Sequence, residues 1–403
     1  MLRTASITFS YMLNYLKSLS LGKEDTLENK NKNLMCLNTT LRKYGGLLSK
    51  VSQMLCYEKY NDDVFSDCKP VYRKKTLENT IKKYKNNEFH SGLTHLEPTV
   101  FKSGSVGQIH RGTFNGKDVI LKVLYEGLYK QTVEDFKILE VIARYMYSTT
   151  DLTFAMEDIK NSIYIEYDFE NERKQQVNMK KIWKHDENIV IPTIIPELCS
   201  KNEVCMEFLK GEVLNRMIDN LNTDEKKSLC ITITKFLFKN ILEHQLLYSD
   251  VHAGNFIVLK DDDVMKLGVL DFGCIQFISE NILDFIKNTL IILSSKNPSK
   301  TEFLNEIVKI GILDSETIKN DEITEYMFEY FKTQYEPFTS DYIECTKEWL
   351  DKVSHKNIEK MKVWKLPKGM VYFNRFIHGL FCLYSIMGFN GCLKKNIIEY
   401  IYI

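Results

Sequence analysis

The segment YSDVHAGNF, residues 248–256, combines side chains that could do acid–base and metal chemistry. It contains Asp250, His252 and Asn255, and apolar runs lead into it and out of it. A solvated loop does not need apolar flanks, whereas a loop that is held over a pocket does. The pattern therefore favours an ordered loop that presents Asp250 and Asn255. We expect His252 to pack within this loop and to hydrogen-bond to backbone, rather than to bind a metal.

A second acidic group follows the next apolar run. The segment VLDFG, residues 269–273, places Asp271 at the end of a predicted strand, and Gly273 allows a sharp turn behind it. NFIVL and KLGVLDF flank a predicted turn and should pair as strands, which would bring Asn255 close to Asp271. Hard oxygen ligands suit Mg²⁺, which binds a few protein oxygens and substrate phosphates. Asp250 can then stay off the metal and orient a nucleophile.

A lysine within an apolar run adds a candidate phosphate contact. Lys122 lies in VILKVLY, and a buried lysine is costly unless it is paired. Small residues precede this run in SGSVGQIH, where Gly104 and Gly107 would let backbone amides approach a phosphate. The turn NGK separates SVGQIHRGTF from KDVILKVLY, which predicts a β-hairpin. A solvent-reaching lysine and a plain turn are the simpler alternatives for these two features.

The order of these parts indicates a protein-kinase-like fold. A small-residue loop is followed by a strand lysine, an acidic helix predicted over residues 162–183, an Asp-x4-Asn loop and an Asp-Phe-Gly turn. Each part alone is unremarkable, but five in this order are hard to obtain by chance. We add Met206, Glu207 and Phe208, in the strand and turn predicted over 203–214, to the nucleotide-binding residues.

At the level of whole motifs, the chain resembles the ABC1/ADCK/UbiB family of atypical kinases, whose members are tied to coenzyme Q biosynthesis. YSDVHAGN is similar to the family's HADPHPGN catalytic loop, and SGSVGQIHRGTF is similar to its alanine-rich AAASIxQVH loop. IEYDFENERKQQ resembles the ExD[FY]xxExxN segment, and VILKVLYEGL resembles VAVKVQRPG. GGLLSKVSQML is similar to the KxGQ signature, which ordinary kinases lack. The resemblance begins near residue 41 and covers most of the chain from there.

The resemblance implies a role for each matched position. Lys122 would contact phosphate and Glu172 would be its ion-pair partner. Asp250 would be the catalytic-loop aspartate, with Asn255 and Asp271 as ligands of Mg²⁺ beside ATP. The small-residue loop would line the nucleotide site with Ser103, Gly104, Ser105, Val106 and Gly107. A regulatory extension would carry Lys50 and Gln53 and meet the acids Glu166 and Asp168. Without the resemblance these two acids, like Glu170 and Glu172, would be taken as a solvated helix face.

The expected fold is α+β: a bilobal protein-kinase-like fold with a helical N-terminal extension packed over the active site. Residues 1–40 are predicted to be an N-terminal segment, residues 41–96 the helical extension, 97–208 the N-lobe and 209–403 the helical C-lobe with both chemical loops. Residues 1–23 contain no acidic side chain and many hydroxyls, which fits either an organellar transit peptide or an ordinary amphipathic helix. We expect a mitochondrial or related organelle, with the cytoplasm as the alternative.

Two features bear on the substrate. Only the five residues Cys274–Ile278 separate Gly273 from a helix predicted to start at Ser279, which leaves no room for the long activation segment of a regulated protein kinase. The sequence also departs from the family, with Ser52 at the KxGQ glycine and Ser249 at the catalytic-loop alanine. We expect an ATPase or a phosphotransferase acting on a small molecule or lipid, such as an isoprenoid-quinone precursor.

The alternative is a pseudokinase scaffold that responds to nucleotide and binds partner enzymes or lipid at a membrane surface. An aminoglycoside- or choline-kinase-like phosphotransferase is a third, weaker hypothesis.

The overall composition narrows the partners. The 403 residues carry 54 basic and 54 acidic side chains, and this balance argues against general nucleic-acid binding. The 10 cysteines occur singly, without zinc-site spacing, as expected for buried thiols in a reducing compartment. The longest apolar run, 379–389, is too short for a bilayer, which needs about 20 residues. The aromatic C-terminal stretch is expected in the core, with lipid contact as the less favoured alternative.

Overall fold

The structure is a computed structural model that describes residues 73–401, except for 105, 147–163, 262–263, 356–357, 362, 366 and 368. The chain divides into two compact units. The first takes in the chain up to Arg173 together with residues 193–208, and the second comprises residues 174–192 and 209–403. Strands and long helices occur in separate stretches of the chain, so the fold is α+β.

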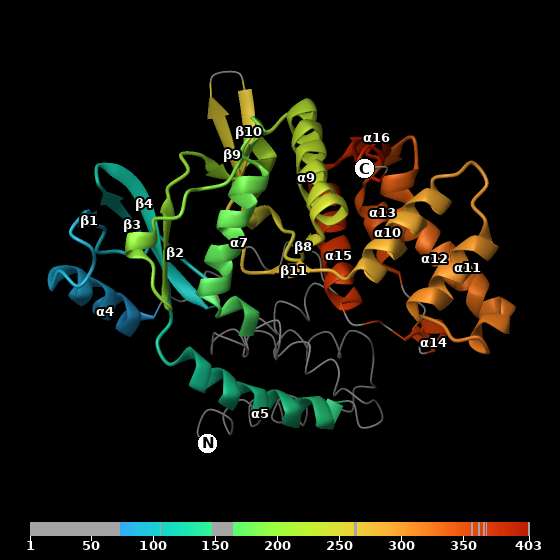
Figure 1. Cartoon of the computed structure of the whole chain (residues 1–403), viewed down its shortest axis with the longest axis horizontal. Helices are drawn as coiled ribbons and strands as arrows, with labels where there is room; N and C mark the ends of the chain where they lie inside the picture. The colour runs from blue at the N-terminus through green and yellow to red at the C-terminus, as the bar shows by residue number, and fades with distance from the viewer. Residues whose placement is uncertain are drawn as a thin grey trace, which may run out of the picture. The chain divides into compact units, whose positions relative to one another are not determined.

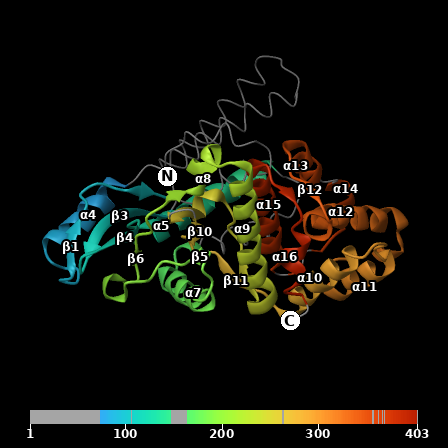
Figure 2. The ribbon, with the colours of Figure 1, turned by 90° about the horizontal axis from the view of Figure 1, so that it is seen from above.

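The first unit is built on an antiparallel sheet (Figure 2). Its strands run in the order β1-β3-β4-β6, and a short β2 pairs with β3. The predicted hairpin is confirmed, because β3 and β4 pair from Gly107↔Leu124 to Phe114↔Lys117. Asn115 and Gly116 close it with φ angles of 47° and 77°, as a tight hairpin turn requires. The bounds are β1 Leu93–Leu96, β2 Lys102–Ser103, β3 Gly107–Phe114, β4 Lys117–Leu124 and β6 Glu203–Glu207.

Side chains alternate along β4, so its two faces pack in different apolar clusters. Val119, Leu121 and Val123 are buried in one apolar cluster with strands β1 and β3. Lys122 points to the opposite face, where Phe169 and Val204 belong to a second cluster. The helices associated with this unit are α4 Lys74–Lys85, α5 Leu128–Met146 and the first turn of α7 Phe169–Ile182.

The helix predicted over residues 162–183 is interrupted: residues 164–166 are helical, and Tyr167 and Asp168 break the helix. The regular helix α7 begins only at Phe169. The Asn171 N–H donates to Asp168 Oδ1 at 2.9 Å, so the Asp168 side chain caps the start of the helix instead of lying on its face. Glu172 is 2% exposed, so the solvated-face alternative fails for this residue.

The second unit is mainly helical (Figure 1). Its long buried helix α9, Thr223–His244, starts at a capping box between Asn222 and Glu225. The helix ends at Gln245, whose left-handed backbone turns the chain into β8, Leu246–Tyr248. α15, Met370–Met387, contacts α9 and β8, so the aromatic C-terminal stretch belongs to the core as predicted. The other helices are α8 Leu214–Met217, α10 Glu280–Leu293, α11 Lys300–Ile310, α12 Asp321–Thr339, α13 Lys347–Ser354, α14 Ile358–Met361 and α16 Lys394–Ile398.

Two small sheets position the YSDVHAGNF loop and the VLDFG turn of this unit. β9 and β10 pair antiparallel from Phe256↔Val269 to Asp261↔Val264, which confirms the predicted strand pair. β11 pairs with β8, and Ser279 precedes α10 as predicted. In the described part of the chain, no helix is long and apolar enough to cross a membrane. The strand bounds are β5 Ile189–Val190, β7 Glu212–Val213, β9 Phe256–Asp261, β10 Val264–Val269, β11 Ile275–Phe277, β12 Ile343–Glu344 and β13 Asn390–Gly391.

Candidate functional site

The catalytic loop leaves β8 at Tyr248 and is tied to the segment behind Gly273. The Ser249 hydroxyl donates to the carbonyl oxygen of Cys274 at 2.7 Å, and the Ser249 N–H donates to the same oxygen at 3.2 Å. Ser249 is buried, so both of its donors are used within the fold. The serine that replaces the family's alanine therefore fixes the catalytic loop against β11.

Asp250 is engaged by two basic side chains. Arg375 Nη2 donates to Asp250 Oδ1 at 2.5 Å, and His252 Nε2 lies 3.6 Å from Asp250 Oδ2. His252 Nδ1 accepts the Gly254 N–H at 3.0 Å, as expected for a histidine that is packed within the loop. Asp250 is a fifth exposed at its side chain, so the carboxylate is held by protein and still reaches solvent.

Asn255 and Asp271 come from adjacent ends of the β9–β10 pair. The Leu270 N–H donates to the Asn255 carbonyl oxygen at 3.0 Å, which continues the pairing beyond Phe256↔Val269. Asn255 is buried, and its Nδ2 donates to the Asp250 carbonyl oxygen at 3.0 Å. Asp271 Oδ1 accepts the Gly273 N–H at 2.9 Å. The two predicted metal ligands are thus neighbours in the fold.

The side chains of Asn255 and Asp271 carry the hard oxygen atoms that Mg²⁺ prefers. The Asn255 amide uses its nitrogen on a backbone carbonyl, so its oxygen is turned away from that contact. Asp271 uses Oδ1 on backbone, which leaves Oδ2 as a hard ligand atom. In the described residues no group of three or more His, Cys, Asp or Glu side chains could hold a metal. A site of one carboxylate and one amide oxygen would therefore depend on substrate phosphates and water for its other ligands.

Tyr248 is a buried polar group that the sequence did not reveal. Its side chain packs against Phe236 and Phe256, with ring centroids 5.8 and 6.2 Å away. Among the described residues no hydrogen bond within the usual distance and angle limits reaches the hydroxyl, although the Asn255 side chain is near enough to lower the pKa of Tyr248 slightly. Burial holds the pKa of Tyr248 well above its ordinary value, and the carboxylates of Asp271 and Asp250 raise it further. The phenol therefore stays protonated beside the acidic groups.

Lys122 and Glu172 form a buried ion pair in the first unit. Lys122 Nζ lies 2.7 Å from Glu172 Oε1 and 2.8 Å from Oε2, so the ammonium contacts both carboxylate oxygens. The ammonium also lies 4.9 Å from the centroid of the Phe169 ring. Sequence reasoning placed this lysine inside an apolar strand, and the structure supplies the partner that such a charge requires.

The two glycines of the small-residue loop, Gly104 and Gly107, have different surroundings. A Cβ at Gly107 would lie 2.5 Å from the Val123 carbonyl oxygen, so Gly107 is required by the close approach of β4. A Cβ at Gly104 would meet no atom closer than 3.7 Å. The Gly104 N–H donates to the Gly107 carbonyl oxygen at 2.8 Å, which closes the loop on itself. Val106 is buried, Ser103 lies in β2, and Ser105 lies outside the described residues.

The predicted nucleotide contacts at the end of β6 have their backbone donors occupied. The Glu207 N–H donates to the Thr193 carbonyl oxygen at 2.8 Å, and the Phe208 N–H donates to the Asp118 carbonyl oxygen at 3.0 Å. Met206 is buried in the cluster of Phe169 and Val204. Contacts from Glu207 and Phe208 to an adenine would therefore have to use groups other than these N–H donors.

The residues of the predicted regulatory contact are only partly described. Lys50 and Gln53 lie outside the described residues. Glu166 precedes the interruption at Tyr167, and Asp168 caps α7. The predicted meeting of Lys50 with these acids stays a prediction.

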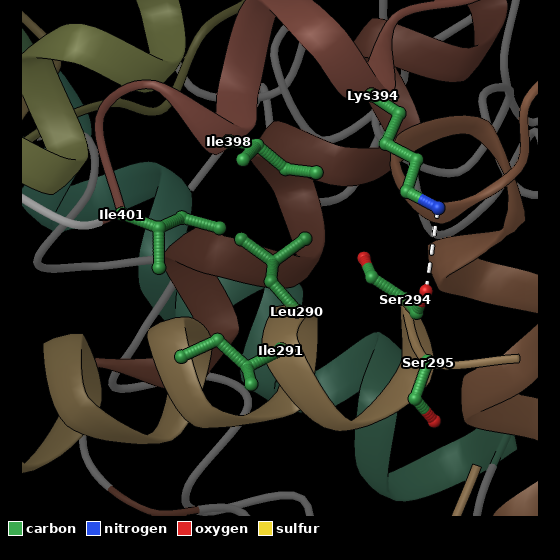
Figure 3. Close-up of a pocket in the computed structure, with 7 residues that line it drawn as sticks. All are labelled: Leu290, Ile291, Ser294, Ser295, Lys394, Ile398 and Ile401. Carbon is green, nitrogen blue, oxygen red and sulfur yellow. Dashed lines mark hydrogen bonds between the residues drawn. The ribbon is translucent and has the colours of Figure 1, made fainter. Parts of the chain in front are cut away.

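A cavity of about 300 Å³ lies elsewhere in the second unit, between α10 and α16 (Figure 3). Lys394 Nζ lies 3.3 Å from the Ser294 carbonyl oxygen at its edge. None of its lining residues belongs to the catalytic loop or to VLDFG, so it is separate from the candidate site. The cavity is lined by Leu290, Ile291, Ser294, Ser295, Lys394, Ile398 and Ile401.

Arg375 contacts the candidate site, and sequence reasoning missed it. It lies in MVYFNRFIHGLFCLYSIM, which was interpreted as core because of its aromatic content. A charged residue in the middle of an apolar helix is the signal that could have revealed it, by the same argument that singled out Lys122.

Comparisons with known proteins place this geometry in a family. A model described as the ABC1 atypical kinase-like domain matches residues 64–304. A mitochondrial atypical kinase COQ8B of Danio rerio is 26% identical over 196 residues, which cover 48% of this chain and 31% of the relative. AarF domain-containing protein kinase 1 of Mus musculus is 24% identical over 303 residues, covering 70% and 57%. The chloroplastic protein ACTIVITY OF BC1 COMPLEX KINASE 8 of Arabidopsis thaliana is 29% identical over 223 residues, covering 52% and 28%.

The chain thus spans less than two thirds of the length of each of these relatives. The solved structure of Rv3197 from Mycobacterium tuberculosis, in complex with erythromycin, is similar with a TM-score of 0.63 and 19% identity. The match covers 93% of this chain and 97% of that one, and at this identity it shows the fold alone. Since the family model spans more than half of the 403 residues, the chain belongs to the ABC1 atypical kinase-like family.

Proposed function

We propose that the protein is an atypical kinase-like enzyme that binds ATP with Mg²⁺ and either hydrolyses it or transfers its terminal phosphoryl group to a small molecule or lipid. The observation that carries the proposal is the buried ion pair of Lys122 with Glu172, in which both carboxylate oxygens hold the ammonium. A buried charge pair is a weak means of gaining stability, so its presence supports a functional role.

In this proposal each unit supplies its own part of the chemistry. Lys122 of the first unit contacts phosphate oxygens, and Glu172 keeps the ammonium charged and in place. Asn255 and Asp271 of the second unit hold the metal, which when bound neutralises charge that develops on the phosphates. Asp250 orients the attacking hydroxyl or water through its carboxylate. The bilobal arrangement and the covering N-terminal extension belong to the same proposal.

The short connection behind Gly273 supports a small acceptor over a protein. Ile275–Phe277 pairs with Leu246–Tyr248 as β11 and β8, and α10 follows at Glu280. The segment that presents protein substrates in regulated kinases therefore has no counterpart of similar length here. A small molecule or lipid does not need such a segment for binding. A lipid acceptor would also be consistent with the proposed role in quinone metabolism.

The cellular setting is proposed from the relatives. Two of them carry organellar names, mitochondrial for COQ8B and chloroplastic for the Arabidopsis protein. We propose that this chain acts in a mitochondrion or related organelle, on isoprenoid-quinone precursors or a related lipid. Peripheral contact with a membrane and association with enzymes of quinone synthesis follow from that choice, whereas nucleic acid is not a proposed partner.

Nucleotide-dependent thermal stabilisation tests the metal assignment. Saturating ATP with Mg²⁺ should raise the melting temperature of the wild type, because ligand at about a hundred times Kd stabilises a protein by about 2.7 kcal/mol. The Asp271→Asn variant should lose the Mg²⁺-dependent part of this shift. Asp351→Asn makes the same chemical change at an exposed position of α13 and should keep it. An unchanged shift in Asp271→Asn would remove the metal assignment.

A nucleotide-responsive scaffold is the second candidate function. The contact of Asp250 with Arg375 favours it, because a carboxylate that is paired with a guanidinium is a weaker proton acceptor. The two functions differ in turnover. If the wild type binds Mg²⁺ and ATP but releases no phosphate with lipid or detergent present, the scaffold is the better description.

A further inference from the structure

Helix α15 meets the catalytic loop at a charged contact. Arg375 Nη2 donates to Asp250 Oδ1 at 2.5 Å, although the two residues are 125 positions apart. Their side chains are 25% and 21% exposed. Charge-assisted hydrogen bonds of this kind are short and directional, so the contact restricts where the Asp250 carboxylate points.

A glycine on the same helix face fixes how close α15 comes to the loop. Gly379 follows Arg375 by four positions, so both lie on one side of the helix. A Cβ at Gly379 would lie 2.3 Å from the Val251 carbonyl oxygen. Only a glycine lets the helix backbone rest against the residue that follows Asp250. The guanidinium is therefore delivered from a helix that is in direct contact with the loop.

The second carboxylate oxygen of Asp250, Oδ2, lies near the His252 side chain. His252 Nε2 lies 3.6 Å from Oδ2, and His252 Nδ1 accepts the Gly254 N–H. Asn255 Nδ2 holds the Asp250 backbone carbonyl at 3.0 Å. The backbone and the carboxylate of Asp250 are thus fixed by separate contacts, and Arg375 holds the carboxylate from outside the loop.

We propose that Arg375 is a positioning residue for Asp250, and that Gly379 sets the distance from which it acts. The inference rests on the proposed function, since it assigns to Asp250 the orientation of the acceptor. Arg375 fixes Oδ1, so that the carboxylate presents one defined face to the attacking group. Arginine suits this task better than lysine, because its planar guanidinium donates in fixed directions.

A purely structural role would require the ion pair to contribute to stability. Asp250 is partly exposed, so its charge does not need a protein partner to avoid the cost of burial, and the pair contributes little stability. An inhibitory lock is the other alternative, in which Arg375 occupies Asp250 and blocks the reaction. Positioning and locking predict opposite changes in turnover when the guanidinium is removed, which makes the proposal testable by kinetics.

The test is steady-state ATP turnover of Arg375→Gln, with the acceptor or detergent that supports the wild type. We expect kcat to fall about a hundredfold, the size of effect that misplacing a reacting group by about an ångström produces. The KM for ATP and the thermal shift with Mg²⁺ and ATP should stay near wild type, because Arg375 donates to Asp250, which is not a proposed metal ligand. Arg216→Gln, at an exposed ion pair of the same unit, is the matched control.

Two further variants separate positioning from loss of stability. Turnover of Arg375→Ala should recover on adding guanidinium at concentrations too low to denature, and should not recover with equal sodium chloride, because the added cation replaces the missing group. Gly379→Ala should lower kcat while Arg375 is still present, because the new methyl pushes α15 from the loop. Arg375→Lys should not restore full kcat.

The outcomes distinguish the inference from the function on which it rests. A wild type with turnover and an Arg375→Gln variant with unchanged or higher kcat would overturn positioning and leave the proposed function standing. Failure of guanidinium to recover Arg375→Ala, combined with unchanged kcat in Gly379→Ala, would also overturn it. A wild type without any turnover would remove the proposed function and the inference together.

Discussion

Lys122 and Glu172 form an ion pair, and we expect replacement of each residue to reduce stability by a different amount. Glu172 is 2% exposed at its side chain and Lys122 is 17% exposed. Replacing Lys122 by Met removes the cation that contacts both oxygens of the buried Glu172 carboxylate. Replacing Glu172 by Leu removes the carboxylate from an ammonium that is nearer to solvent and retains the Phe169 ring at 4.9 Å. We therefore expect the Lys122→Met variant to be the less stable of the two.

The magnitudes follow from the cost of breaking a buried ion pair. Breaking a buried pair by removing one partner costs about 3–5 kcal/mol. We expect Lys122→Met near the upper end and Glu172→Leu near the lower end, where about 3 kcal/mol is a change of somewhat more than a hundredfold in an equilibrium constant. The double variant removes both charges and should recover most of the loss, since apolar replacement of a buried pair is often near neutral.

The distribution of tryptophans gives an assay that separates the units. All three tryptophans, Trp183, Trp349 and Trp364, belong to the second unit. Their fluorescence in urea should change little in these variants. Hydrogen exchange of β4 amides, followed by mass spectrometry, reports opening of the first unit and should show the loss. Glu78→Leu breaks an exposed pair with Lys74 and should leave exchange of β4 nearly unchanged.

Two results would refute this reasoning. If each single variant exchanged like the wild type at β4, Lys122 and Glu172 would not be coupled by a desolvated contact. If the double variant were as unstable as the sum of the singles, the cost would come from lost packing and the charges would be incidental.

The remaining predictions concern the small-residue loop and the cysteines. Gly107→Ala should destabilise the hairpin by about 1–3 kcal/mol, as overpacking does, whereas Gly104→Ala should be tolerated, and thermal melts of the two variants compare them directly. Equal melting temperatures would contradict this. Burial raises the pKa of the Cys345 thiol to about 12, so at neutral pH iodoacetamide should modify Cys392 well before Cys345, as peptide mass spectrometry would show. Cys345 reacting as fast as Cys392 would show that this part of the core opens readily.

Regular elements could be predicted because their signals are local. The Asn-Gly turn specified the β3–β4 hairpin, and the apolar alternation on either side set its strands. The pairing of β9 with β10 followed from two apolar runs and a short connection. The start of α7 could not be obtained in this way, because Asp168 is acceptable both on a helix face and as a cap. Only its hydrogen bond to Asn171 decides between them.

The glycines show how one signal can have two causes. Gly104 and Gly107 were both assigned to the approach of a phosphate, and Gly104 has the open surroundings that such a role needs. Gly107 is explained by the Val123 carbonyl oxygen on the neighbouring strand. Sequence alone does not distinguish room for a ligand from room for the protein's own backbone, because both require a missing side chain.

Partners are harder to predict than the charges that need them. Lys122 in an apolar strand and Arg375 in an apolar helix each violate the pattern of their element, so each must find an acid. The acids lie 50 and 125 positions away, at Glu172 and Asp250. Periodicity carries no information over such separations, and Glu172 was assigned only because the family resemblance supplied it. Asp250 was recognised from its own loop, and nothing in that loop points to α15. A cation at an apolar position is therefore a sequence signal for a site, and the fold is needed to show which carboxylate it serves.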